Sequence, residues 1–220
     1  MNIFVTGTGT DVGKTVVSAG LVRALSADYW KPIQAGDLEF TDTEQVKEWV
    51  DSDYVTYYPE KYRLIYPESP HSAAKKEEIC ISLNDFTLPS HSFKNLVIEG
   101  AGGIMVPLND TPDTMADLIL HLNAMVVLVS RNHLGSINQS LLTIEHLRMR
   151  NIPVLGMVFF GKPKRHTEEI ILKYSDYPLL GRVTEEVKID SSIIAQLANQ
   201  FWRSLYSEEV KERFASLKMN

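Results

Sequence analysis

The sequence contains almost no cysteine and no long apolar run. Cys80 is its single cysteine, so an internal disulfide is impossible. The start, Met-Asn-Ile-Phe-Val-Thr-Gly, has no basic residues before its first apolar ones, unlike a secretory signal. The apolar run at 124–129 has the length of a strand, whereas a membrane-spanning helix needs roughly 20 apolar residues. We therefore expect a cytoplasmic protein that does not enter a membrane.

Positive charge is also scarce. The chain has 22 Lys and Arg residues against 28 Asp and Glu residues, which gives a net charge of −6. The densest basic group is Lys162, Lys164 and Arg165, which we interpret as an exposed turn before a helix. Without a basic surface to neutralise phosphates, we expect no nucleic-acid partner.

The remaining composition is typical of one globular domain. With 220 residues, of which 44% are hydrophobic and 23% charged, the chain can bury a sizeable core but is too short for two large domains. It also has no internal repeat or low-complexity tract. We predict a single domain over residues 1–220.

Short β-rich segments alternate with segments of helical periodicity, which is typical of βαβ units around a parallel sheet. The runs at 96–98, 125–129 and 154–158 are apolar on both faces, as in central strands that helices cover on either side. We predict an α/β fold, P-loop NTPase-like, with a doubly wound, mostly parallel sheet and helices on both faces. The predicted strands are 2–6, 96–99, 124–130, 154–160 and 179–183, and the predicted helices between them are 15–25 and 137–149.

Two further segments complete the organisation. The stretch 53–89 is rich in tyrosine and proline and has no long periodic segment, so we predict an insertion of loops and short helices over the sheet. Amphipathic helices are predicted near 191–206 and 208–217, with Trp202 and Phe214 in core or dimer packing.

The most specific motif follows the first strand. Gly7-Thr8-Gly9-Thr10-Asp11-Val12-Gly13-Lys14-Thr15 leads from that strand into a helix, which is the context of a phosphate-binding loop, although five residues instead of four separate Gly7 from Gly13. In such a loop the backbone N–H groups and the helix N-terminus face the phosphates, the lysine reaches the outer phosphates, and the hydroxyl binds Mg²⁺. We expect nucleotide contacts from Asp11, Val12, Gly13, Lys14, Thr15 and Val16.

Three more segments narrow the prediction to one family. They are Lys31-Pro32-Ile33-Gln34-Ala35-Gly36 with Asp42 after it, Glu99-Gly100-Ala101-Gly102-Gly103 at a strand end, and Leu134-Gly135-Ser136-Ile137-Asn138 at a helix start. With the long-spaced phosphate loop, and with Ser69-Pro70-His71 between the first two of them, they resemble the dethiobiotin synthetase family. The resemblance covers roughly the first 190 residues.

The resemblance implies metal-binding roles for two acidic residues and catalytic roles for two lysines. Glu99 ends a strand at the carboxyl edge of the sheet, where a carboxylate can bind Mg²⁺, and Asp42 is the other acidic metal contact beside Thr15. Glu99 could instead be a solvated strand-end carboxylate, and Asp42 could only begin a helix that Thr41 caps. The resemblance implies Lys31 as a catalytic cation together with Lys14. Pro32 fixes an extended exit from a short strand, which directs Lys31 toward the carboxyl end of that strand.

The resemblance also implies the other ligand contacts and a homodimer. Further nucleotide contacts are expected from Gly100, Ala101, Gly102, Thr184, Glu185 and Glu186. Substrate contacts are expected from Lys31, Gln34, Ala35, Gly135, Ser136, Ile137 and Asn138. The last four begin a helix whose free N–H groups would hold a distal carboxylate across the dimer interface.

The implied reaction uses ATP and Mg²⁺ to join CO₂ to 7,8-diaminopelargonate. An amine first forms a carbamate, ATP then phosphorylates it to a carbamic-phosphoric mixed anhydride, and the second amine closes the ring and displaces phosphate. The products are dethiobiotin, ADP and phosphate, and the step belongs to biotin biosynthesis. The implied partners are the diamino acid, CO₂ and a nucleoside triphosphate.

The sequence departs from the family pattern at two positions. Ala35 stands where relatives usually have a hydroxyl near the substrate, so Gln34 is a candidate to supply that hydrogen bond. Phe160 stands at a strand end where relatives often have an asparagine that reads adenine. Because apolar contact discriminates weakly between bases, we expect the chain to accept other nucleoside triphosphates.

Two other functions share parts of this pattern. A partitioning-type ATPase switch has the same sheet and loop but normally carries an extra lysine near the start of the loop, where this chain has Thr8. An amidoligase-like relative acting on another carboxylate is the second alternative. The six histidines show no metal-ligand spacing and no hydrolase triad, and His71 is interpreted as part of a turn.

Overall fold

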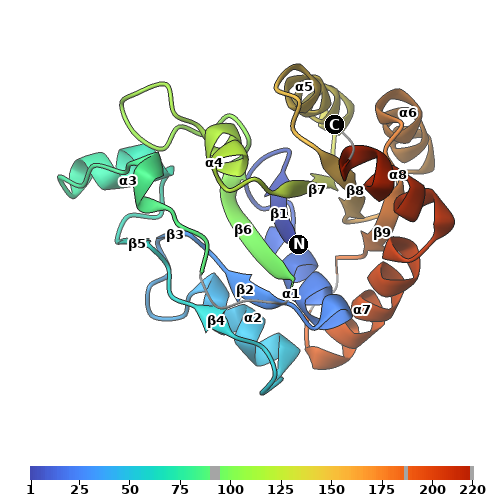
Figure 1. The fold of residues 1–220 in the computed structure, drawn as a ribbon, viewed down its shortest axis with the longest axis horizontal. Coiled ribbons are helices and arrows are strands. Elements are labelled where there is room, and N and C mark those ends of the chain that lie inside the picture. The colour runs from blue at the N-terminus through green and yellow to red at the C-terminus, as the bar shows by residue number, and fades with distance from the viewer. Residues whose placement is uncertain (90–94, 186–187, 219–220) are drawn as a thin grey trace.

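The computed structural model describes residues 1–89, 95–185 and 188–218, and its centre is a seven-stranded sheet (Figure 1). The strand order is β4-β2-β6-β1-β7-β8-β9, and every neighbouring pair is parallel. The strands are β1 (Asn2–Gly7), β2 (Asp28–Trp30), β4 (Tyr57–Tyr58), β6 (Leu96–Gly103), β7 (Met125–Arg131), β8 (Val154–Phe160) and β9 (Leu179–Val183). The predicted parallel, doubly wound sheet is therefore confirmed.

Helices cover both faces of this sheet, as its apolar strands require. One face packs against α1 (Lys14–Leu25), α2 (Asp42–Val50) and α7 (Ser191–Leu205). The other packs against α4 (Met115–His121), α5 (Ser136–Met149) and α6 (Arg165–Ser175) (Figure 1). The last helix, α8 (Glu208–Lys218), is held to the sheet because Arg213 donates a 2.7 Å hydrogen bond to the carbonyl of Val154.

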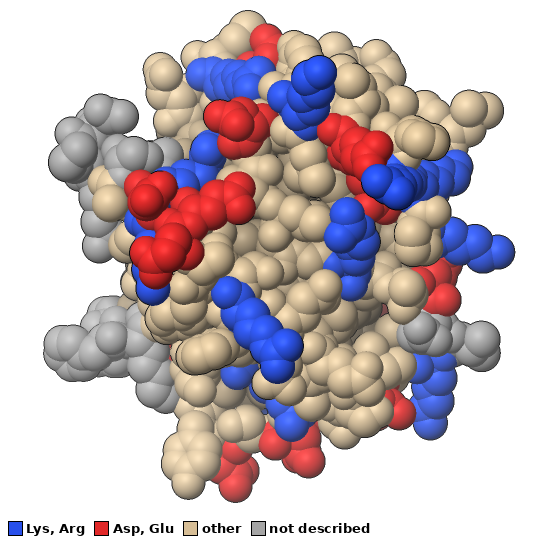
Figure 2. Space-filling model, turned by 90° about the vertical axis from the view of Figure 1, so that its right-hand side faces the viewer, with Lys and Arg blue, Asp and Glu red and all other residues tan. Residues whose placement is uncertain are grey.

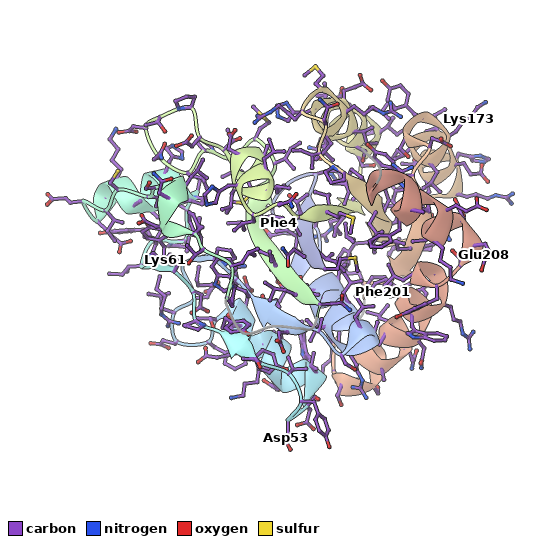
Figure 3. The ribbon with its side chains drawn as sticks, in the orientation of Figure 1. Phe4, Asp53, Lys61, Lys173, Phe201 and Glu208 are labelled. Carbon is purple, nitrogen blue, oxygen red and sulfur yellow. The ribbon has the colours of Figure 1, made fainter. Side chains whose placement is uncertain are left out.

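Side chains along each strand alternate between the two faces of the sheet, so the interior contains two hydrophobic cores, one on each face. Phe4 faces the core under α4 and α5, whereas its neighbours Ile3 and Val5 face the core under α1 and α7, since successive strand side chains point to opposite faces. Figure 3 labels Phe4 and Phe201 inside the molecule, and both are fully buried. Helix α7 approaches α1 so closely that a Cβ atom on Gly20 would lie 2.6 Å from Phe201, so this contact requires glycine.

The segment 53–89 differs in part from the prediction of loops and short helices. It contains α3 (Pro70–Lys76) and a 3₁₀ turn, η1 (Leu83–Asp85), but also strand β4 at the edge of the main sheet and strand β5 (Tyr62–Leu64). Strand β5 pairs in parallel with β3 (Ile33–Ala35) in a separate two-stranded sheet. Strands of two or three residues are too short to show an alternating pattern in the sequence.

Two surface properties follow from the described residues. Lys and Arg side chains are interspersed with Asp and Glu on the face that Figure 2 presents, in keeping with a net charge of only −6. None of the helices in the described part of the chain has the length and apolar character that crossing a membrane requires.

The strand order identifies the edge at which a ligand can bind. The chain moves from β1 to β2 and β4 on one side and later to β7, β8 and β9 on the other, so the order reverses around β1. In open α/β sheets the crevice for ligands lies beyond the carboxyl ends of the strands at such a reversal. The carboxyl ends of β1, β6, β7 and β8 carry the phosphate loop, Glu99 to Gly103, Arg131 and Phe160.

Candidate active site

The phosphate loop turns sharply between β1 and α1. Asp11 has a φ of 55° and Gly13, the residue before α1, has a φ of 93°. A side chain on Gly13 would also meet Phe160, since a Cβ atom there would lie 2.4 Å from the ring. Glycine is therefore required at Gly13 by both conformation and space. No side chain caps α1 at this end, so its first N–H groups are available to an anion.

Lys14 lies back over the loop that carries it. Its ammonium group donates a 3.1 Å hydrogen bond to the carbonyl of Gly9, and its side chain is buried. Burial lowers the pKa of Lys14 from its ordinary value, although the Glu99 carboxylate acts in the opposite direction. The Lys14 side chain therefore lies beside the uncapped N-terminus of α1, where the motif places it.

Four predicted site residues meet at the carboxyl ends of β1 and β6. The Thr15 hydroxyl donates to Oε1 of Glu99 at 2.9 Å and to Oδ1 of Asp42 at 3.4 Å. The Lys31 ammonium pairs with Oδ2 of Asp42 and lies 3.2 Å from Oε1 of Glu99. Residues that are 84 positions apart in the chain, Thr15 and Glu99, are therefore in direct contact.

Burial and neighbouring charges shift the pKa values of Lys31 and Tyr29 in this cluster. Burial lowers the pKa of Lys31, but the Glu99 and Asp42 carboxylates raise it by more, so its pKa lies above the ordinary value. The Tyr29 hydroxyl donates to Oε2 of Glu99 at 2.9 Å, and burial together with the Glu99 charge raises the pKa of Tyr29 well above its ordinary value. Lys31 is consequently a stable cation and Tyr29 a stable hydrogen-bond donor at neutral pH.

Asp42 also fulfils the structural role that the sequence left open. It is the first residue of α2, and Thr41 and Glu44 form a reciprocal capping box around it, with bonds of 2.6 Å and 3.3 Å. The cap fixes the start of α2, and this start holds the Asp42 carboxylate beside Thr15 and Lys31. The metal-contact and helix-start interpretations are compatible.

These side chains line one cavity of about 790 Å³. Predicted residues in its wall are Asp11, Val12, Gly13, Lys14, Thr15, Val16, Lys31, Gln34, Ala35, Asp42, Glu99, Gly100, Ala101, Gly102 and Glu185. The segment 53–89 contributes Pro67, Glu68, Ser69 and Pro70 to the same wall. The cavity joins the phosphate loop to the Lys31 segment, so a nucleotide and a second substrate can meet there.

The wall around Ala35 has other polar groups nearby. The side chain of Gln34 is already engaged, because it donates to the carbonyl of Gly36 at 3.0 Å and accepts from the N–H of Asp42 at 3.4 Å. The Ser69 hydroxyl lies in the same cavity wall and is 3.0 Å from Nδ1 of His71. Ser69 is therefore a better candidate than Gln34 for the hydroxyl that Ala35 lacks.

Several predicted contacts lie outside this cavity. Gly135, Ser136, Ile137 and Asn138 form the start of α5 and are absent from the cavity wall of this chain. Thr184 follows β9 and is not a wall residue, and Glu186 lies outside the described residues. Gly135 and Asn138 are exposed, and no side chain caps the N-terminus of α5.

The sequence prediction missed Arg131, which also lines the cavity. Its guanidinium group donates to the carbonyl of Asp11 at 2.8 Å and pairs with Glu185 at 2.5 Å. It also lies over the ring of Phe160, with 5.5 Å between the guanidinium carbon and the ring centre. An arginine at the end of the apolar strand 125–131 was the available signal, since that position faces the ligand edge.

The donor set fits Mg²⁺ bound together with a nucleotide. Asp42, Glu99 and Thr15 offer two carboxylates and a hydroxyl, and Mg²⁺ prefers oxygen ligands and takes few of them from the protein when phosphates are present. Within the described ranges, no group of three or more His, Cys, Asp or Glu side chains could hold a metal ion. A metal ion at these residues would therefore share its coordination with phosphate and water.

Comparison with known sequences identifies the family of the chain. A family model described as an AAA domain matches residues 1–192. The ATP-dependent dethiobiotin synthetase BioD of Cytophaga hutchinsonii is 46% identical over 203 residues, which cover 92% of this chain and 98% of that protein. The protein of the same name from Christiangramia forsetii is 45% identical over 202 residues, covering 92% and 96%.

Comparison with solved structures gives the same fold. A ParA family ATPase from Chlorobium tepidum matches with a TM-score of 0.54 and 13% identity over 99% of both chains. The cell division ATPase MinD of Pyrococcus furiosus matches with a TM-score of 0.54 and 16% identity over 98% of this chain and 99% of its own. At such low identity the likeness concerns the fold alone.

Proposed function

Because the chain belongs to the ATP-dependent dethiobiotin synthetase family, we propose that it is a cyclo-ligase of biotin biosynthesis. It would convert 7,8-diaminopelargonate, CO₂ and ATP into dethiobiotin, ADP and phosphate. The observation that carries the proposal is the contact of Lys31 with Asp42 and Glu99 beside the phosphate loop. This contact brings a buried cation to the place where a transferred phosphoryl group would lie.

The reaction needs positive charge at each stage and no side-chain nucleophile. One amine adds to CO₂ and loses a proton to give a carbamate. A carbamate oxygen then attacks the γ-phosphorus of ATP, and ADP leaves. The second amine attacks the carbonyl carbon of the mixed anhydride, the C–O bond to phosphate breaks, and the ring closes.

Lys14 and Lys31 are the cations that serve these steps. Lys14, beside the N–H groups at the start of α1, would stabilise the outer phosphates and the charge that develops on them. Lys31 would stabilise the carbamate and the mixed anhydride, since it lies in the same cavity and remains protonated. Both groups act by fixed charge, so their positions matter more than their exchange of protons.

The metal contacts would be Thr15, Asp42 and Glu99, which lie together at the start of α1 and α2 and in β6. Mg²⁺ bound there would neutralise charge on the β- and γ-phosphates. The three side chains are already within hydrogen-bond distance of one another, so binding the ion would need only small movements of their oxygens.

The nucleotide and the diamino acid would occupy opposite parts of the cavity. The backbone of residues 11–16 and of Gly100, Ala101 and Gly102 would bind the triphosphate. Thr184 and Glu185 would contact the nucleoside, since they follow β9 at the ligand edge of the sheet, and the same role is proposed for Glu186, which comes next in the sequence. Gln34 and Ala35 would form the substrate wall beside Lys31.

The diamino acid also has a distal carboxylate, for which the cavity of one chain offers no predicted contact. We assign this role to Gly135, Ser136, Ile137 and Asn138 of a second copy in a homodimer. Support comes from the exposed, uncapped N-terminus of α5 and from the exposed apolar side chains of Leu134 and Leu142 beside it. Sedimentation that finds a fully active monomer at assay concentration would refute the dimer.

A partitioning-type ATPase remains the alternative from another functional class, because the matching ParA and MinD structures share the fold. The site argues against it. A switch has no use for a buried lysine between two carboxylates in a cavity that also reaches Ser69 and Pro70. An amidoligase acting on another carboxylate would use the same loop, and substrate choice distinguishes it.

The deciding assay measures phosphate release with ATP, Mg²⁺, bicarbonate and 7,8-diaminopelargonate against a reaction without the diamino acid. We expect release only with all components, and one dethiobiotin formed for each phosphate. ATP hydrolysis that is independent of the diamino acid would favour the switch. Release with a different carboxylic acid would favour the amidoligase. We further propose that the reaction takes place in the cytoplasm, where ATP is available.

A further inference from the structure

The reaction proposed above gives no task to Arg131, the last residue of β7. The strand before it is apolar and buried, yet the arginine side chain is 33% exposed and lines the cavity beside the phosphate loop. A charged group at the carboxyl end of a central strand faces the ligand crevice of the sheet. Arg131 is therefore placed to contact a ligand at this end of the cavity.

Three contacts fix the plane of the guanidinium group. The Asp11 carbonyl accepts from Nη1 at 2.8 Å, the Glu185 carboxylate pairs with Nη2 at 2.5 Å, and the Phe160 ring lies 5.5 Å from the guanidinium carbon. These partners come from the phosphate loop, the segment after β9 and the end of β8. An arginine held in this way has already lost the side-chain freedom that ligand binding would otherwise cost.

The Phe160 ring packs against Arg131 and leaves little of its own surface exposed to the cavity. Phe160 is only 9% exposed, and its ring packs against Gly13, where even a Cβ atom would not fit. The guanidinium group lies over the same ring. A nucleoside at this end of the cavity would therefore meet mainly the Arg131 side chain, which is 33% exposed.

We propose that Arg131 is the platform on which the nucleotide base stacks. This proposal rests on the proposed function only in that a nucleotide binds at the phosphate loop. The guanidinium plane carries a delocalised charge and stacks on the π face of any base. Because Asp11 holds it to the phosphate loop, the platform lies beside the nucleotide that the loop binds, and it grips the base by its face rather than by its edge.

The test compares ligands with and without a base. Calorimetry would measure the binding of non-hydrolysable ATP, CTP and GTP analogues and of inorganic tripolyphosphate, each with Mg²⁺. We expect Arg131→Ala to weaken all three analogues by about tenfold, since stacking on a base is typically worth that much, and to change tripolyphosphate affinity by less than about twofold. Arg131→Lys keeps the charge but loses the plane, so it should weaken the analogues nearly as much.

Kinetics and a control variant complete the test. In turnover, the nucleotide KM should rise in Arg131→Ala while kcat and the KM for the diamino acid remain unchanged. The matched control is Arg165→Ala in α6, because the Arg165 side chain is 85% exposed, pairs with Glu169 one helical turn away and lies outside the cavity wall. It should change none of these values. Melting temperatures would verify that each variant is folded.

Two results would overturn the proposal. Unchanged affinity for the three analogues would mean that the base does not contact Arg131. Equal weakening of tripolyphosphate and nucleotides would mean that Arg131 acts by shaping the loop at Asp11. Both binding measurements are made without the diamino acid, so neither depends on ring closure. Failure of the proposed function would therefore be detected separately, in the phosphate-release assay.

Discussion

Tyr29 donates a hydrogen bond of 2.9 Å to Oε2 of Glu99, while Oε1 of the same carboxylate accepts from Thr15 and Lys31. Both residues are buried, one in β2 and one in the neighbouring strand β6. Because burial and the Glu99 charge raise the pKa of Tyr29, its hydroxyl keeps its proton. Tyr29 therefore fixes the orientation of Glu99 and leaves Oε1 directed at the cluster.

The first prediction concerns this hydrogen bond. Tyr29→Phe should lower kcat/KM by roughly 10- to 100-fold and raise the Mg²⁺ concentration needed for half-maximal turnover, since groups that orient a metal ligand have effects of this size. The matched control is Tyr57→Phe. The Tyr57 ring lies 6.4 Å from that of Tyr29, and its hydroxyl is among the described buried groups without a hydrogen-bond partner. Equal effects of the two substitutions would exclude an orienting role for Tyr29.

Lys14→Ala should reduce turnover by on the order of 100-fold or more and leave the fold intact. The Lys14 ammonium group bonds only to the Gly9 carbonyl among the described contacts, so little structure depends on it. Phosphate release and the far-ultraviolet circular dichroism spectrum would be compared with those of the unchanged protein. Near-normal turnover would show that Lys14 does not face the transferred phosphoryl group.

Lys31→Ala should abolish turnover but, unlike Lys14→Ala, also destabilise the fold. Removing the ammonium group leaves the Asp42 and Glu99 carboxylates close together without their cation. The melting temperature should therefore fall in EDTA, and Mg²⁺ should raise it more in the variant than in the unchanged protein. If Mg²⁺ shifts both melting temperatures equally, the two carboxylates are not the metal contacts.

Glu168 supports a prediction about pH. Its carboxylate accepts from Asn132 at 2.6 Å, from the N–H of Lys164 at 3.2 Å and from Arg182 at 2.5 Å. Burial raises the pKa of Glu168, but the bonds from Arg182, Asn132 and Lys164 outweigh it, so the pKa lies below the ordinary value of 4.5. The ionised group thus stabilises the fold above that value, and its contribution is lost as the pH falls through the lowered pKa.

Glu168→Gln should accordingly reduce the free energy of unfolding at pH 7 by on the order of 1–3 kcal/mol. The difference between variant and unchanged protein should shrink as the pH falls below the ordinary value of 4.5 and through the lowered pKa, because Glu168 then loses the charge that the variant lacks. Urea unfolding at several pH values would measure both. A difference that stays constant over this range would mean that packing, and not charge, makes the contribution.

The sequence was informative about single residues and strands, and less so about their contacts. It named Thr15, Lys31, Asp42 and Glu99 as site residues, and the structure brings them together, but the pairing of Lys31 with both carboxylates depends on packing between distant segments. Arg131 was missed for the same reason, since its partners Asp11 and Glu185 are 120 and 54 positions away. Helix α4 was missed although Thr114 and Asp117 form a capping box, a pattern visible in the sequence.

The end of a strand was also harder to predict from the sequence than the strand itself. The strand predicted at 96–99 continues to Gly103 as β6, with an irregularity in its pairing with β1 between Val5 and Gly7 and a φ of 68° at Gly102 that glycine accommodates. Gly103 pairs with Gly7, and a Cβ atom on Gly103 would lie 3.4 Å from the Gly7 carbonyl oxygen, an ordinary contact distance. Such a contact between neighbouring strands is invisible until the strand order is known.

The last prediction concerns the choice of nucleotide. The ring of Phe160 offers no hydrogen bond to a base, and Arg131, whose guanidinium group lies over that ring, already donates to Asp11 and Glu185. Sites that discriminate by paired hydrogen bonds reject analogues strongly, whereas apolar contact discriminates by no more than roughly 10- to 200-fold. We therefore expect kcat/KM for CTP and GTP to lie within about 200-fold of the value for ATP, with affinity resting mainly on the triphosphate. Steady-state kinetics with the three nucleotides at saturating diamino acid would measure this, and strict selectivity for ATP would show that unidentified hydrogen bonds read the edge of adenine.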